Sequence, residues 1–150
     1  MRLSSWRDAA PHREAMSRKV LDVVEPVLAA LGAGRDPDVW IAWGDDPAAR
    51  YTIMAPTLAG LVVCHVRVNV PQEGPRASGR LIRWNRVQIG DLAVETQAGH
   101  RIVSIQVEGA ILKGVDEEAD RVSAFVLGLF AAIDGRVPSD AAGDRGVVSA

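Results

Sequence analysis

The order of secondary-structure signals constrains the fold of this chain more than any motif. Residues 11–31 and 116–134 carry apolar side chains at helical spacing, whereas residues 38–113 alternate like strands joined by short turns. Helices and strands that occupy separate parts of a chain are typical of an α+β domain. The sequence therefore predicts an N-terminal helix, a six-stranded antiparallel meander sheet, strongly curved or roll-like, and a C-terminal helix.

The domain boundaries follow from the same pattern. The chain has 150 residues, a common size for a single domain. Residues 1–10 are polar and are predicted to be a flexible leader, and residues 136–150 lack periodicity and are predicted to be a disordered tail. One α+β domain is expected between them, over residues 11–135.

The strands are placed by alternation and by turn residues. The clearest alternation puts Val62, Cys64 and Val66 on one face, and Leu61 and Val63 on the other. The long connection 71–79, a bulge at 85–86 and a hairpin turn at 90–91 are further expectations. The six predicted strands are 38–44, 50–55, 60–71, 80–89, 92–97 and 101–113.

The core is expected where the apolar face of the sheet meets the helical stripes. Both helices are predicted to share one face of the sheet, because one layer of two helices can cover it. Residues from the strands and from the second helix should then be almost fully buried. They are Val66, Ile105, Val107, Phe125 and Leu129.

Composition narrows the range of partners and compartments. A net charge of −2 gives no global electrostatic footprint for nucleic acid, which is an unlikely partner. The single cysteine excludes an intrachain disulfide, no apolar stretch is long enough to cross a bilayer, and the N-terminus has no apolar signal region. The expectation is a cytoplasmic protein with no membrane partner.

The search for catalytic chemistry finds no motif. His12, His65 and His100 have no second ligand at a metal-binding spacing. Cys64 lies on the valine face of its strand, so a small buried side chain is a better interpretation than a reactive thiol. Catalytic residues, a metal and a cofactor are therefore not expected.

One sheet face carries polar residues that could hold a ligand. His65, Arg67 and Asn69 alternate along one strand, and Arg83 and Trp84 lie in an arginine-rich stretch. These five residues are the candidate ligand contacts, and an anion would suit them. A solvated face that simply tolerates polar residues is the plainer and favoured interpretation, because such faces are common in antiparallel sheets.

Two tryptophans complicate the first strand. Trp40 and Trp43 are three residues apart, so they face opposite sides of a regular strand. One of them should belong to the core, but the sequence leaves open which. The other then lies beneath a helix, in a ligand pocket or against a partner.

Two functions from different classes remain. The first is a non-catalytic binding or adaptor domain that forms a homodimer through apolar surface at Leu61, Val63, Leu127 and Phe130. The second is a small-molecule carrier or enzyme that uses the sheet face around His65. In that alternative Arg67 and Arg83 join His65 as contacts. The sequence identifies neither the protein partner nor the small molecule.

Overall fold

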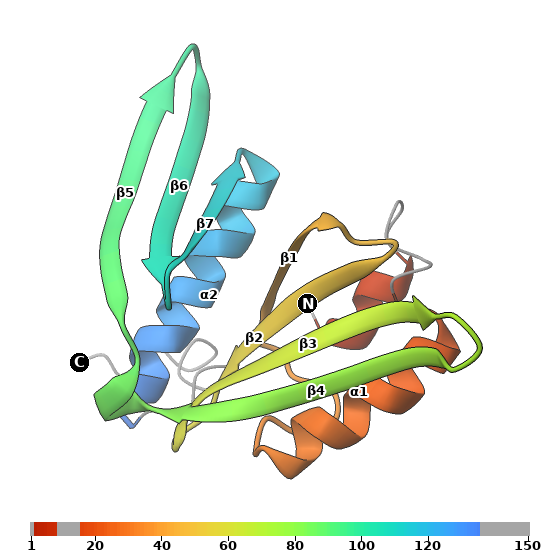
Figure 1. Ribbon diagram of the computed structural model, residues 1–150. Coiled ribbons are helices and arrows are strands. Elements are labelled where there is room, and N and C mark those ends of the chain that lie inside the picture. The colour runs from red at the N-terminus through yellow and green to blue at the C-terminus, as the bar shows by residue number, and fades with distance from the viewer. Residues whose placement is uncertain (1, 9–15, 136–150) are drawn as a thin grey trace.

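The computed structural model describes residues 2–8 and 16–135, and it is an α+β structure with two helices and two antiparallel sheets (Figure 1). Its elements in chain order are the 3-10 helix η1 Leu3–Asp8, α1 Arg18–Ala30, β1 Ile41–Asp46, β2 Arg50–Pro56, β3 Gly60–Val70, β4 Gly74–Arg83, the 3-10 helix η2 Trp84–Arg86, β5 Ile89–Gln97, β6 His100–Val107, β7 Ala110–Val115 and α2 Glu117–Ile133.

The strands form two sheets and not the single six-stranded sheet that the sequence predicts. The large sheet has the order β1-β2-β3-β4, and the small sheet has the order β5-β6-β7. The break falls at η2, where the chain leaves the last β3–β4 pair, Gly60 with Arg83. The expected bulge at 85–86 is therefore a 3-10 turn that redirects the chain into a second sheet.

Two turns differ from the expected ones. Residues 90–91 lie inside β5, whereas a hairpin at Glu108 (φ 51°) and Gly109 (φ 81°) divides the predicted strand 101–113 into β6 and β7. Two successive residues with positive φ match the right-handed twist of a tight hairpin. The predicted long connection 71–79 is also wrong, because β4 already begins at Gly74.

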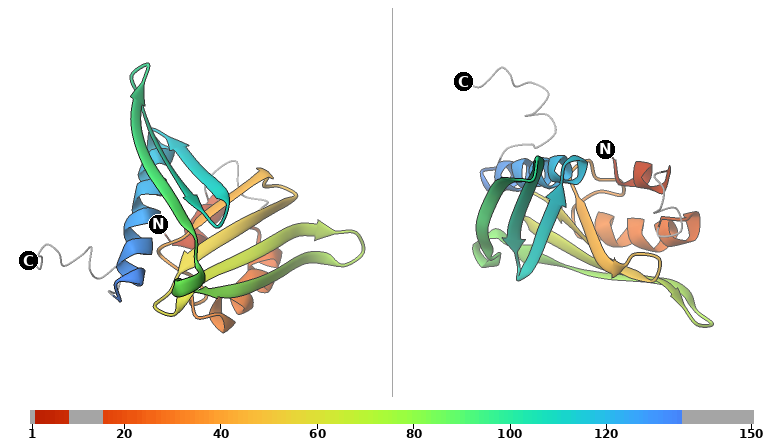
Figure 2. Two further views of the ribbon diagram at one scale, coloured as in Figure 1. Left: turned by 60° about the vertical axis from the view of Figure 1, so that its left-hand side comes forward. Right: turned by 90° about the horizontal axis from the view of Figure 1, so that it is seen from above.

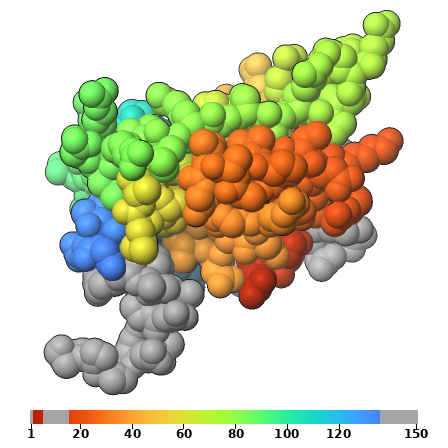
Figure 3. All heavy atoms as spheres, turned by 90° about the horizontal axis from the view of Figure 1, so that it is seen from below, coloured from red at the N-terminus to blue at the C-terminus, as the bar shows by residue number. Residues whose placement is uncertain are grey.

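The helices cover different sheets, so the prediction that they share one sheet face is wrong. Helix α1 packs on β3 and β4, and Figure 3 shows it lying across this side of the large sheet. Helix α2 packs mainly on β6 and β7 and also reaches β1 and β2. The two views in Figure 2 show the small sheet and α2 standing beside the large sheet.

Strand β3 joins two hydrophobic cores. Its even-numbered residues Val62, Cys64 and Val66 belong to the α1-side core, and Leu61 and Val63 belong to the α2-side core. All five residues predicted to be almost fully buried are at most 1% exposed, which confirms that prediction. They are Val66, Ile105, Val107, Phe125 and Leu129.

Part of the predicted leader is packed on the domain. Leu3 is fully buried in the α1-side core, and Ser4 donates backbone and hydroxyl hydrogen bonds to Asp36, at 2.7 and 2.6 Å. Helix α1 begins after Ser17 and runs to Ala30 with Pro26 inside it. The predicted helix start at 11–15 and the predicted tail 136–150 lie outside the described residues.

Candidate functional site

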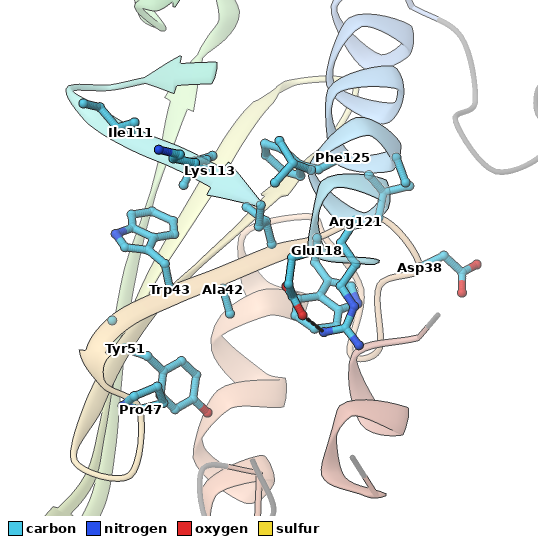
Figure 4. A pocket seen from close by; sticks show the side chains of 17 residues that line it. Asp38, Ala42, Trp43, Pro47, Tyr51, Ile111, Lys113, Glu118, Arg121 and Phe125 are labelled. Carbon is cyan, nitrogen blue, oxygen red and sulfur yellow. Dashed lines mark ion pairs between the residues drawn. The ribbon is translucent and has the colours of Figure 1, made fainter. Parts of the chain in front are cut away.

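A cleft lies between β1, β7 and the first half of α2 (Figure 4). It has a volume of about 490 Å³, within the range of ligand sites in proteins. We call it the β1–β7 cleft. It is lined by Asp38, Val39, Trp40, Ile41, Ala42, Trp43, Gly44, Pro47, Tyr51, Ile111, Leu112, Lys113, Glu118, Arg121, Val122, Ala124 and Phe125.

Two sheet edges border this cleft. Strand β1 pairs only with β2, and β7 pairs only with β6. Within the described parts of the chain no further strand adds to either edge, so each edge presents unpaired backbone N–H and C=O groups. The cleft therefore has hydrogen-bonding backbone on two sides and apolar side chains between them.

Strand β1 supplies the aromatic wall. Trp40 packs against the α1-side core and Trp43 against the α2-side core, so the expected opposite orientation is confirmed. Both are half-buried, and both line the cleft. A register shift between Trp43 and Asp46 marks a bulge, and the chain has no room for a side chain at Gly44, where a Cβ would lie 2.7 Å from the carbonyl oxygen of Arg50.

The charged groups of the cleft stand at its rim. Arg121 and Glu118 form an ion pair at 3.3 Å, and Lys113 lies on the β7 side near Ile111 (Figure 4). Across residues 2–8 and 16–135, no group of three or more His, Cys, Asp or Glu side chains is arranged to hold a metal ion. Between these charged groups the lining is mostly apolar and aromatic, which suits the binding of an apolar ligand.

A second, smaller pocket adjoins the first on the open face of the large sheet. It has a volume of about 310 Å³ and shares Trp43, Gly44 and Tyr51 with the β1–β7 cleft. We call it the arginine pocket. It is lined by Trp43, Gly44, Asp45, Arg50, Tyr51, Thr52, His65, Val66 and Arg67.

The structure separates the five predicted ligand contacts. His65 and Arg67 lie together in the arginine pocket, where His65 Nδ1 and Thr52 Oγ1 are 3.2 Å apart in a hydrogen bond. Asn69 is exposed farther along β3 and does not line this pocket. Arg83 pairs with Gly60, seven residues back along β3 from Arg67, which corresponds to about 23 Å, and its side chain belongs to the opposite sheet face.

Trp84 has a structural role in η2. Its indole Nε1–H donates a hydrogen bond to the carbonyl oxygen of Thr57 at 2.9 Å, and its ring packs against the α2-side core. Trp84 is half-buried, and an aromatic ring that packs on a core with its polar tip hydrogen-bonded is typical of a packing residue. Trp84 thus helps to hold the point where the chain passes from the large to the small sheet.

The predicted interface residues fall into two groups. Leu61 is 0% exposed and Val63 is 3% exposed, because the α2-side core covers them within the chain itself. Leu127 is 71% exposed and Phe130 is 39% exposed on the outer side of α2. The surface available to a second copy is therefore on α2 and not on the second face of β3.

Cys64 is buried, as predicted. It is fully covered in the α1-side core, and this burial raises the pKa of its thiol to about 11. Tyr51 is also buried and donates its hydroxyl hydrogen bond to Met16 Sδ at 3.0 Å. Burial raises the pKa of Tyr51 well above its ordinary range, so neither group is ionised near neutral pH.

The side chain of Asp116 binds residues of β6 and not the helix that follows it. It stands at the N-cap position of α2, but its side chain makes no capping hydrogen bond to the helix. Instead its carboxylate lies 2.7 Å from His100 Nδ1 and accepts the backbone N–H of Arg101 at 3.1 Å. The hydrogen bond to His100 and the one to Arg101 hold the pKa of Asp116 below its ordinary value.

Most residues of the β1–β7 cleft were not singled out by the sequence. The sequence does indicate Trp43 as a possible site residue, because two tryptophans on opposite strand faces leave one for a pocket or a partner. The sequence does not indicate Ile111 or Lys113 as site residues, because the predicted strand 101–113 contains no turn at Glu108 and Gly109. Without that turn, β7 does not exist as a separate edge.

Comparison of the chain with models of known protein families, with curated proteins and with solved structures finds no match. Neither α1 nor α2 is long and apolar enough to cross a bilayer, and the same holds for every helix in the described ranges. What the domain does must therefore be inferred from its own residues.

Proposed function

We propose that this protein is a non-catalytic binding domain that holds an extended segment of a partner protein in the β1–β7 cleft. One observation carries the proposal: an apolar cleft of about 490 Å³ lies between two sheet edges that have no strand partner among the described residues. Extended peptides bind such edges by adding a strand, with backbone hydrogen bonds for affinity and pockets for alternate side chains.

The chemistry of the walls defines the segment. Trp43, Ile41 and Phe125 offer apolar surface, so every second side chain of the segment should be apolar and point into the cleft. Lys113 makes no ion pair with any described carboxylate, and it stands at the rim beside Ile111. An acidic residue next to the apolar positions would therefore suit this cleft.

A selection from a library of random ten-residue peptides on the purified full chain tests this function. The expected result is a set of peptides with apolar residues at alternate positions, and N-methylation of the backbone at alternate residues should abolish their binding. Ile111→Arg should also abolish it, because Ile111 lines the cleft and is 71% exposed, which leaves the fold intact.

Leu127→Arg is the matched control. Leu127 is likewise 71% exposed, but it lies on α2 outside the cleft. It should leave peptide binding unchanged. Peptides that bind Ile111→Arg as well as the wild-type chain, or that tolerate N-methylation, would contradict strand addition in this cleft.

We also propose that the domain self-associates as a homodimer through the outer side of α2. Leu127, Phe130 and Ile133 recur every three residues on one side of this helix and are 71%, 39% and 39% exposed. Leu92 and Val94 pair with Ile105 and Val103, so they share the sheet face that α2 covers over β6 and β7.

These five residues would form one apolar surface beside α2, since Leu92 and Val94 remain 46% and 65% exposed there. A second copy across a two-fold axis is the simplest cover for such a surface. Sedimentation equilibrium at micromolar concentration tests it. A dimer is expected for the wild-type chain and for Ile111→Arg, and a monomer for Leu127→Arg. A single species of 16.0 kDa for the wild-type chain would overturn the dimer.

A further inference from the structure

Three arginines stand in a row across the large sheet. Arg50 on β2 is directly opposite Arg67 on β3, and Arg67 is directly opposite Arg76 on β4. Directly opposite residues of antiparallel strands project from the same face with their Cβ atoms about 5 Å apart. All three side chains are exposed, and they concentrate positive charge on a chain whose net charge is −2.

The row is only partly neutralised. Arg76 forms an ion pair with Glu73. Across the described residues, neither Arg50 nor Arg67 forms an ion pair with a carboxylate. Asp45 lines the same pocket without pairing to either of them. Like charges placed directly opposite each other destabilise a pair of strands, so an anion between Arg50 and Arg67 would relieve their repulsion.

The arginine pocket has the donors that such an anion needs. Arg50, Arg67, Thr52 and His65 line it, and each guanidinium offers a planar set of N–H donors that matches the oxygens of a phosphate. Trp43 forms part of its wall and offers an aromatic face to the rest of a ligand.

We propose that the arginine pocket binds a small organic phosphate, with the phosphate between Arg50 and Arg67 and the organic group against Trp43. Two guanidinium charges match a phosphate monoester dianion better than the single charge of a carboxylate. This site is separate from the proposed peptide cleft, although the two adjoin at Trp43. It would remain if peptide binding in that cleft were disproved.

Isothermal titration calorimetry on the full chain tests the proposal with phenyl phosphate, inorganic phosphate and benzoate. Phenyl phosphate should bind one-to-one and more tightly than either of the others. Arg50→Gln and Arg67→Gln should each weaken its binding about tenfold to a hundredfold, because each removes a charge-assisted hydrogen bond. Trp43→Leu should remove the advantage of phenyl phosphate over inorganic phosphate.

Arg86→Gln is the matched control. Arg86 is exposed in η2, outside the arginine pocket, and it too forms no ion pair with a described residue, so its substitution should leave binding unchanged. Equal losses in Arg86→Gln and Arg67→Gln would reveal a non-specific charge effect and overturn the site. Absence of phenyl phosphate binding to the folded wild-type chain would also overturn it.

Three further probes distinguish the sources of the phosphate. They are adenosine monophosphate, a phosphoserine peptide and vesicles that contain phosphatidic acid. Binding of adenosine monophosphate that depends on Arg67 supports the small-ligand proposal. Binding of the peptide or of the vesicles alone, without either small phosphate, would assign the arginine row to a macromolecular partner and overturn it.

Discussion

The face of strand β3 that carries its odd-numbered residues is covered in its first half and open to solvent in its second half. Leu61 and Val63 are 0% and 3% exposed under the α2-side core, whereas His65 and Arg67, two and four residues beyond Val63, are exposed on the open sheet. The alternation is the same in both halves. Only the cover differs, because the small sheet and α2 reach across the first half and end before the second.

This difference teaches where function can lie in such a fold. The covered half supplies stability through buried apolar area. The open half keeps polar and charged side chains whose arrangement is unfavourable for stability, with Arg50 and Arg67 directly opposed. Residues that stabilise the fold and residues that are available to a ligand are thus only two positions apart on one strand, at Val63 and His65.

The largest expected effect comes from placing a lysine in the covered half, compared with placing one in the open half. Val63→Lys should destabilise the domain by about 4 kcal/mol or more, because a buried, unpaired ammonium must lose its proton or leave the core. His65→Lys, two residues along the same face, should change the free energy of unfolding by only about 0.5 kcal/mol. Urea denaturation of the two variants measures the contrast.

Equal losses of stability in Val63→Lys and His65→Lys would break the comparison. They would mean that both halves of the face are covered in solution, as a second copy on the open half would bring about. Repeating the denaturation at several protein concentrations separates that case, because the stability of a dimer rises with concentration.

Much of the fold could be predicted from the sequence. The α+β class, the second helix and the buried set around Phe125 and Leu129 follow from periodicity, which reports which residues share a face. Periodicity does not report what covers a face. Leu61 and Val63 therefore read as surplus surface for a partner, although the small sheet and α2 already cover them.

The second sheet could not be predicted because its signals are local and ambiguous. At the turn formed by Glu108 and Gly109, the only sequence signal is one glycine inside an alternating run. Before η2, apolar residues such as Ile82 have even numbers, and after it those such as Val87 have odd numbers, a change that predicts a bulge where the structure has η2. Each turn changes which strands are edges. The β1–β7 cleft depends on both turns, because together they make β7 an edge strand. A site between two sheet edges therefore cannot be predicted from strand patterns alone.

The candidate contacts were predictable only as far as they share one strand. His65 and Arg67 were found because alternation places them together on β3. Arg50 was missed because its position depends on the register of β2 against β3, where it stands opposite Arg67. Arg83 was wrongly grouped with them, because β4 runs antiparallel to β3 and carries it to the far end of the sheet.

An expected effect of intermediate size is the dependence of stability on pH that the buried thiol of Cys64 on β3 produces. Cys64 points into the α1-side core, and burial raises the pKa of its thiol from 9.0 to about 11. The folded state therefore holds this proton more strongly than the unfolded state. Its contribution to stability is complete below pH 9 and is lost as the pH rises from about 9 to about 11.

Over that range the loss should amount to about 2–3 kcal/mol for the wild-type chain in excess of any loss in Cys64→Ala. The difference between the two proteins removes the contribution of other titrating groups. Thermal or urea denaturation at pH 8, 9, 10 and 11 gives the two curves. Parallel curves would show that Cys64 is accessible to solvent and that β3 does not separate its faces as described.

The smallest expected effect has the opposite sign. Arg67→Gln should raise the free energy of unfolding by about 0.2–1 kcal/mol in buffer without phosphate, because it relieves the repulsion from Arg50 across the strand pair. High salt screens exposed charges, so the gain should shrink between 0.01 M and 1 M sodium chloride. Arg86→Gln, which has no opposed arginine in the paired register, should show no such gain.

A loss of stability in Arg67→Gln would mean that this side chain supports the sheet by its packing. The open half of β3 would then resemble the covered half, with its residues retained for stability and not for a ligand.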